Sequence, residues 1–161
     1  MNRTCVLIWN VRGLNDRSRQ DNLRKVVDDS KPAVVCIQET KLSNITVRDV
    51  TAFLGREFTN YVFLPAQQTR GGILVAWRDG SFVVSHRVQL HSVSVLFSNQ
   101  VDPPWWFTGV YGPHRDDEKV AFLDELRKVQ SNCHGPWMLA GDFNMIYYSE
   151  DKNNENISTE P

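Results

Sequence analysis

Short apolar runs recur along the chain, and amphipathic stretches separate several of them. Apolar runs that end in turn residues are typical of β-strands, and strands that alternate with helical patterns are typical of α/β proteins. We therefore predict an α/β fold. The runs between residues 61 and 107 follow one another without a helical stretch, which predicts an antiparallel meander. The residues expected to form strands are 6–9, 33–37, 61–64, 72–77, 82–84, 93–97, 105–110 and 137–140.

Three amphipathic stretches are expected to form helices. A capping Asn15 or Asp16 precedes the first, and Asp116 or Asp117 caps the third, because short polar side chains accept hydrogen bonds from the first turn. Spacings of three and four residues place apolar side chains on one face of each helix. These side chains are Leu23, Val26 and Val27 in the first stretch, Val47, Val50, Phe53 and Leu54 in the second, and Val120, Leu123, Leu126 and Val129 in the third.

The chain of 161 residues has the size of one domain, and its 41% apolar residues are enough for a core. After Tyr148 the composition becomes polar and loses its apolar periodicity. We therefore expect one domain over residues 1–148 and a polar tail over residues 149–161 that stops within a loop. A disordered tail on a complete domain is the alternative.

Charge and targeting signals limit the classes of function. The 18 Lys and Arg residues nearly cancel the 19 Asp and Glu residues, whereas proteins that hold DNA mainly by neutralising phosphates carry a basic excess. Any nucleic-acid binding must therefore come from a local site. The N-terminus lacks a signal peptide, and no apolar stretch is long enough to span a bilayer. We expect an intracellular protein that is neither secreted nor bound to a membrane.

Polar side chains of catalytic type follow four of the expected strands: Asn10, Glu39, Tyr111 and Asp142. Ligands of α/β sheets bind outside strand ends, so the recurrence predicts a shared site, although each residue alone could simply make a turn. Carboxylate and amide oxygens such as those of Glu39 and Asn10 suit Mg²⁺. The four histidines lack zinc-ligand spacing, and no phosphate-binding glycine motif occurs.

Five motifs together carry a family resemblance: WNVRGL at residues 9–14, QETK at 38–41, RGGI at 70–73, VYGP at 110–113 and GDFN at 141–144. Their order is that of the endonuclease/exonuclease/phosphatase superfamily, and within it the set most resembles the endonuclease domain of plant LINE-type (non-LTR) retrotransposons. The sequence EDKNN at residues 150–154 strengthens the narrower match. The resemblance covers essentially the whole chain.

The resemblance implies a four-layer α/β sandwich of the deoxyribonuclease type, with two mixed β-sheets face to face, helices outside and the last strands missing. It also implies phosphodiester cleavage with a divalent metal, Mg²⁺ or alternatively Mn²⁺. DNA is the implied substrate and the nucleus the implied compartment. A reverse transcriptase domain in a longer reading frame is the implied partner.

The resemblance also assigns roles to individual residues. Glu39 would bind the metal, with Asn10 as a further ligand or a neighbour of the metal. Asp142 would orient or deprotonate the attacking water, while Asn144 and the Tyr111 hydroxyl would hold the scissile phosphate. Arg70 is expected to add a phosphate contact through its forked donors, and a surface charge beside a turn is the alternative.

One part of the family pattern is absent. The pattern continues to a late Asp-His pair, but no histidine follows His134 in this chain. We therefore expect a truncated domain with impaired activity, because a lost acid or base group removes about 10²- to 10⁴-fold of rate. The alternatives are a non-catalytic retroelement remnant or interaction module, and a phosphatase that acts on small phosphoesters.

Overall fold

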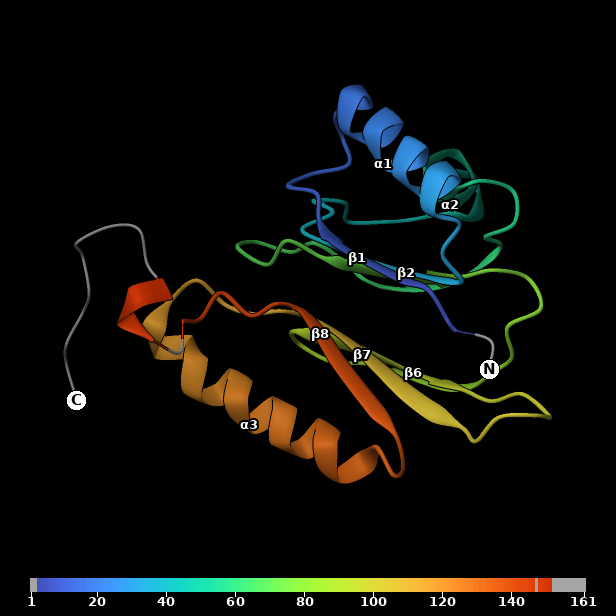
Figure 1. The fold of residues 1–161 in the computed structure, drawn as a ribbon. Coiled ribbons are helices and arrows are strands. Elements are labelled where there is room, and N and C mark those ends of the chain that lie inside the picture. Colours follow the sequence, from blue (N-terminus) through green and yellow to red (C-terminus); the bar gives the residue numbers. More distant parts are fainter. Residues whose placement is uncertain (1–2, 147, 152–161) are drawn as a thin grey trace.

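The computed structural model describes residues 3–146 and 148–151, and the rest of the expected polar tail lies outside the described residues. The chain folds into four layers, with helices outside and two four-stranded sheets inside (Figure 1). Each sheet contains one parallel and two antiparallel strand pairs. The expected sandwich of two mixed sheets is therefore confirmed. Among the described residues, no helix combines the length and the apolar composition needed to cross a membrane.

The first sheet consists of β1 (Val6–Asn10), β2 (Val34–Gln38), β4 (Ile73–Trp77) and β3 (Asn60–Leu64), in that order. Two helices, α1 (Arg17–Ser30) and α2 (Val47–Leu54), cover its outer face. Asp16, one of the two expected caps, accepts hydrogen bonds from the first turn of α1, and Thr46 forms a capping box with Asp49 at α2. Their buried side chains, such as Leu23 and Phe53, pack on the sheet.

The second sheet consists of β5 (Val83–Val88), β6 (Ser92–Phe97), β7 (Trp105–Tyr111) and β8 (Trp137–Asp142), in that order. The helix α3 (Asp116–Asn132) covers its outer face, and a short 3₁₀ helix, η1 (Ser149–Asp151), follows later in the chain. The main core lies between the two sheets. Its buried residues include Val34, Cys36, Ile73 and Val75 from the first sheet and Val93, Val95, Phe107 and Tyr111 from the second.

The expected single meander over residues 61–107 is wrong. Neighbouring strands pair antiparallel within β3–β4 and within β5–β6–β7, but the chain leaves the first sheet after β4 and enters the second at β5. Strand β4 pairs with β2 as well as with β3. The β2 run is buried along its whole length, so it needs a hydrogen-bonding neighbour on each side. The need of β2 for a second neighbour therefore determines where β4 pairs, and the local sequence pattern of residues 61–107 does not contain this information.

The start and the buried face of α3 also differ from the prediction. Arg115 occupies the N-cap and makes no side-chain capping hydrogen bond, and Asp116 and Asp117 lie inside the first turn, where acidic charges interact favourably with the helix dipole. Val120 is 69% exposed and Leu123 is 36% exposed. Residues three apart drift around a helix with 3.6 residues per turn. The buried face is instead made by Phe122, Leu126 and Val129.

Parallel pairing at one side of each sheet determines where the polar strand ends meet. Asn10 and Gln38 are register partners at the ends of β1 and β2, and Tyr111 and Asp142 are partners at the ends of β7 and β8. Strands β1 and β8 are edge strands of the two stacked sheets. The side chains of Asn10 and Asp142 bridge them directly by a hydrogen bond. The fold therefore brings one end of each sheet to a common place.

Gly109 in β7 allows the two sheets to approach closely. A Cβ added at this position would overlap the buried Cys36 Sγ in β2. We expect Gly109→Ala to lower the free energy of unfolding by about 1–3 kcal/mol through overpacking. Adding Cys36→Ala should recover at least about 1 kcal/mol of this loss. It removes the Cys36 Sγ with which the new alanine Cβ would collide, so the effects of the two substitutions are coupled. Urea denaturation measures both effects, and simple additivity of the two substitutions would contradict this packing.

Candidate active site

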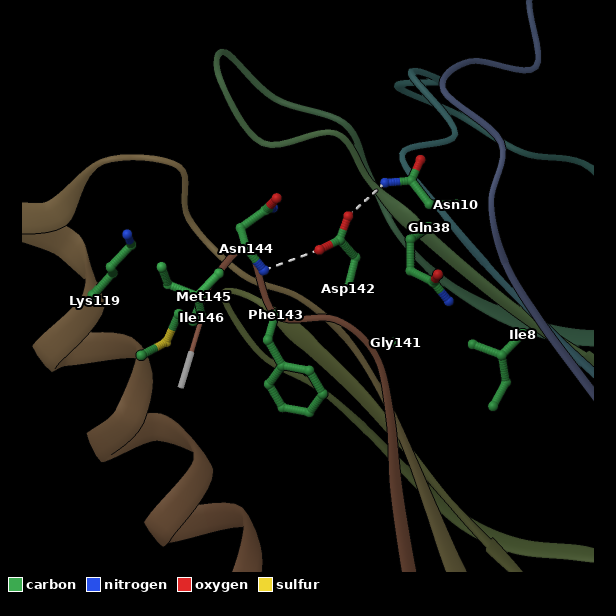
Figure 2. Close-up of a pocket in the computed structure, with 10 residues that line it drawn as sticks. All are labelled: Ile8, Asn10, Gln38, Lys119, Gly141, Asp142, Phe143, Asn144, Met145 and Ile146. Carbon is green, nitrogen blue, oxygen red and sulfur yellow. Dashed lines mark hydrogen bonds between the residues drawn. The ribbon is translucent and has the colours of Figure 1, made fainter. Parts of the chain in front are cut away.

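A hydrogen bond between Asn10 and Asp142 joins the two sheets at the centre of the site. The Asn10 Nδ2 atom donates to Asp142 Oδ2 at 2.8 Å, and the Asn144 backbone N–H donates to Asp142 Oδ1 at 2.9 Å (Figure 2). Asn10 Oδ1 accepts a hydrogen bond from the Arg12 backbone N–H at 3.1 Å. Each carboxylate oxygen of Asp142 therefore has a fixed donor, which holds this side chain in one orientation.

Glu39 follows β2 directly and has a backbone that glutamate rarely adopts. Its φ is 56°, in the left-handed region. The conformation is held because the Glu39 N–H donates to the Gly72 carbonyl at 2.9 Å and the Glu39 carbonyl accepts from Gly13 at 2.8 Å. Its side chain is only 18% exposed, and Lys41 Nζ lies 3.4 Å from Glu39 Oε1. Such strain persists where surrounding structure enforces it, and it clusters at functional sites.

Tyr111, the last residue of β7, has a hydroxyl on which the charges of both Glu39 and Asp142 act. Burial, the charge and hydrogen bonding of Glu39, and the charge of Asp142 raise the pKa of Tyr111 to about 12, and a hydrogen bond from Asn144 partly opposes them. The phenol therefore keeps its proton at physiological pH and remains a hydrogen-bond donor. Its hydroxyl also lies 2.9 Å from His114 Nε2.

Asn144 has a left-handed backbone, with φ of 49°, which asparagine tolerates better than most residues. Its Nδ2 atom donates to the Gly112 carbonyl at 2.7 Å. The Gly112 N–H donates in turn to the Asp142 carbonyl at 2.8 Å, and a Cβ at Gly112 would overlap the Phe143 carbonyl. The segments that carry Tyr111 and Asp142 are thus joined side by side after their strands end.

Two cavities flank these residues. A cleft of about 700 Å³ opens beside Asn10, Asp142 and Asn144, and Lys119 of α3 lines its far side (Figure 2). A second cavity of about 360 Å³ is lined by Glu39, Tyr111 and the other residues Lys41, Ser43, Ala66, Gln67, Gln68, Thr69, Arg70, Gly71 and His114. The structure therefore brings all six candidate site residues to one region.

Three further residues of the site region were not predicted. Lys41 pairs with Glu39, Lys119 lines the cleft, and His114 contacts the Tyr111 hydroxyl. Lys41 and His114 stand close in sequence to the QETK and VYGP motifs, which is the signal that could have identified them. Lys119 lies on α3 and carries no such signal. Arg70 also donates through Nη2 to Gln67 at 3.0 Å within its own loop.

The oxygen donors of the site suit a hard divalent cation. Within the described residues, no group of three or more His, Cys, Asp or Glu side chains could hold a metal ion. The site instead offers the carboxylates of Glu39 and Asp142, which both act on the Tyr111 hydroxyl, together with the amide oxygens of Asn10 and Asn144. Mg²⁺ keeps several waters and is bound through one or two carboxylates plus substrate phosphate. The donor set would therefore suit a hard divalent cation that keeps part of its water shell.

Gly71 permits the approach of Glu39 to Tyr111. A Cβ at Gly71 would lie 2.8 Å from Tyr111 Cε1 and 2.9 Å from Glu39 Cγ. We expect Gly71→Ala to push both side chains apart and to lower any reaction that uses both groups by about 10²-fold, the usual cost of displacing a reacting group by about 1 Å. The melting temperature should fall as well, because Tyr111 is buried in the core between the sheets. Steady-state kinetics, at a temperature where thermal unfolding shows both proteins to be folded, tests this, and unchanged activity would exclude the close contact.

Several solved structures resemble the fold. A truncated TDP2 from Caenorhabditis elegans is 16% identical with a TM-score of 0.59, and covers 94% of this chain and 65% of its own. The AP endonuclease LMAP from Leishmania major is 18% identical with a TM-score of 0.63, covering 94% and 58%. ANGEL2, a 2′,3′-cyclic phosphatase, is 13% identical with a TM-score of 0.65, covering 88% and 52%.

These likenesses support the fold, and the chain spans between 49% and 66% of the length of the similar structures. No curated protein sequence matches the chain. The sequence profile of the Endonuclease/Exonuclease/phosphatase family, in contrast, matches residues 7–158, which is nearly the whole chain. The chain therefore belongs to the endonuclease/exonuclease/phosphatase family.

Proposed function

We propose that the chain is a divalent-metal-dependent endonuclease that hydrolyses phosphodiester bonds in DNA. The observation that carries the proposal is that two carboxylates from different sheets, Glu39 after β2 and Asp142 at the end of β8, both act on the neutral Tyr111 hydroxyl. Two carboxylates allow a division of work, because one can hold a metal while the other accepts a proton from water. The family profile and the phosphodiester or phosphate chemistry in the names of two similar structures support hydrolysis of this kind.

Each polar residue then has a role in the hydrolysis. Asp142 accepts a proton from the attacking water, and the hydrogen bond from Asn10 keeps its carboxylate aimed. Tyr111 and Asn144 donate to the phosphate oxygens, and Arg70 adds a forked positive contact from the neighbouring cavity. Glu39, with Asn10 beside it, would hold Mg²⁺ or Mn²⁺, which supplies Lewis-acid charge to the phosphoryl oxygens when bound.

The distribution of cations favours a polymeric substrate over a small phosphoester. Lys41 and Arg70 line the cavity on the Glu39 side, while Lys119 lines the cleft on the Asp142 side. Positive side chains on two sides of the reacting centre match several phosphates along one strand, whereas a single phosphate group needs only one cluster. Because the overall charge of the chain is close to zero, the proposed attraction for DNA has to come from the positive side chains at the site.

A role in retroelement insertion is the finer part of the proposal. It rests on the sequence resemblance to plant LINE-type endonuclease domains, including EDKNN at residues 150–154. In that role the enzyme nicks nuclear target DNA, and the exposed end serves a reverse transcriptase in a longer reading frame.

Substrate choice tests the proposal. We expect the protein to convert supercoiled plasmid to the nicked circle in Mg²⁺, to hydrolyse bis(p-nitrophenyl) phosphate more slowly, and to leave p-nitrophenyl phosphate intact. Gel electrophoresis and absorbance at the same enzyme concentration measure the three reactions. Hydrolysis of the monoester without plasmid nicking would favour the phosphatase alternative. Inertness towards all three substrates would favour the non-catalytic remnant.

A further inference from the structure

His114 holds a position in the site that its sequence context did not predict. It follows the Gly112-Pro113 turn after β7, and its Nε2 atom lies 2.9 Å from the Tyr111 hydroxyl. The two rings meet edge to face, with centroids 5.8 Å apart and planes at 80°. The imidazole itself is exposed and lines both the Glu39 cavity and a smaller one beside Arg70. It therefore contributes little to the core.

The turn that carries His114 is fixed independently of its side chain. The Gly112 N–H and carbonyl are bonded to Asp142 and Asn144, and Pro113 is buried. The Tyr111 N–H donates to the His91 carbonyl at 3.1 Å, which anchors the end of β7. Removing the imidazole should therefore leave the backbone in place and affect only the Tyr111 hydroxyl.

The Tyr111 hydroxyl has one hydrogen and two neighbouring groups, Glu39 and His114, with which it can form hydrogen bonds. An ionised carboxylate such as Glu39 can only accept, whereas an imidazole nitrogen either donates or accepts, depending on where its hydrogen lies. Glu39 hydrogen bonds to the phenol and its charge disfavours the phenolate. The arrangement with fewest conflicts has the hydroxyl donating towards Glu39 and His114 Nε2 donating to the phenol oxygen. The opposite arrangement turns two acceptors, the phenol oxygen and the carboxylate, towards each other.

We propose that His114 is a positioning residue, whose Nε2–H group donates to the Tyr111 oxygen and so directs the hydroxyl hydrogen into the site. The direction matters because the Glu39 side of Tyr111 is where the phosphate would lie, so its catalytic consequence rests on the proposed function. With His114 as donor, Tyr111 presents its hydrogen to a phosphate oxygen. Without it, the hydroxyl is free to rotate, and the donor is lost for part of the time.

The hydrogen position is tested without any catalysis. In protein labelled with ¹⁵N-histidine, a long-range ¹H–¹⁵N correlation at about pH 8 distinguishes the two neutral tautomers. We expect the His114 hydrogen on Nε2, and a mixture of tautomers in Tyr111→Phe. The spectrum of His114→Gln assigns the signals, and His134→Gln, at an exposed histidine in the loop before β8, is the matched control. A hydrogen on Nδ1 would overturn the proposal, because Nε2 would then accept from Tyr111.

The catalytic consequence is tested by plasmid nicking. We expect His114→Ala to lower kcat by about tenfold with KM changed less than about twofold, while His114→Gln keeps most activity because its amide donor has a similar reach. In the Tyr111→Phe background the alanine substitution should cost less than about twofold. The proposal would be overturned if His114→Ala and His114→Gln lost the same activity. It would also be overturned if His114→Ala cost as much in the Tyr111→Phe background as in the wild type. If the wild-type protein cleaves no DNA, the proposed function is refuted. The NMR measurement of the His114 tautomer then still tests the direction of the hydrogen bond to Tyr111.

Discussion

Replacing Asp142 by asparagine should lower DNA nicking by about 10²- to 10⁴-fold, the contribution of a positioned general base. The substitution keeps the size of the side chain and one acceptor oxygen. It removes the negative charge that draws a proton from water, and it places an amide NH₂ against one of two donors, Asn10 Nδ2 or the Asn144 N–H. Both effects act at the reacting centre, so kcat should fall more than KM rises.

The control for this experiment is Asp29→Asn, which removes the same charge from an exposed position near the end of α1. Single-turnover nicking of a supercoiled plasmid measures the variants at equal DNA saturation. If Asp142→Asn cleaves as fast as Asp29→Asn, Asp142 is not the base. A loss that disappears at saturating DNA would instead assign Asp142 to binding.

Replacing Glu39 by glutamine should abolish both the stabilising effect of Mg²⁺ and the cleavage. A ligand that binds only the folded state stabilises it by RT ln(1 + [L]/Kd), which is about 1.4 kcal/mol at ten times Kd. For a chain of this length that energy raises the melting temperature by about 3–6 °C. The glutamine variant keeps the buried packing of a side chain that is only 18% exposed, but loses the charge. Differential scanning fluorimetry with Mg²⁺, and with EDTA as reference, measures the shift.

Lys41 makes the same experiment more specific. Its ammonium group lies 3.4 Å from Glu39 Oε1 and forms an ion pair with this carboxylate. It therefore competes with a metal ion for the same oxygen. Lys41→Met should therefore leave the Mg²⁺ stabilisation intact or increase it, whereas Glu39→Gln removes it. A Mg²⁺-dependent shift that survives in Glu39→Gln would place the metal elsewhere.

Part of the site follows from the sequence alone. Asn10, Tyr111 and Asp142 were predicted because apolar runs end there, and strand ends of stacked sheets meet. The strands in the structure are one or two residues longer than predicted. These three residues are therefore the last residues of β1, β7 and β8 and do not follow them. Their roles in catalysis remain predictions.

Other features depend on contacts that no local pattern contains. The left-handed backbone of Glu39 runs against the preference of glutamate and is imposed by Gly13 and Gly72 from distant segments. The division of the expected meander between two sheets follows from the need of β2 for a second neighbour. His114 belongs to the site only because the turn after β7 returns its ring onto Tyr111.

The central claim is that Glu39 and Asp142 form one metal-dependent hydrolytic site. The most direct test is nicking of supercoiled plasmid by the wild-type protein, Glu39→Gln and Asp142→Asn, each in Mg²⁺ and in EDTA. We expect the wild-type protein to nick in Mg²⁺ but not in EDTA, and each variant to nick at least about 10²-fold more slowly. Nicking that persists in EDTA, or that either variant retains, would contradict a shared metal-dependent site.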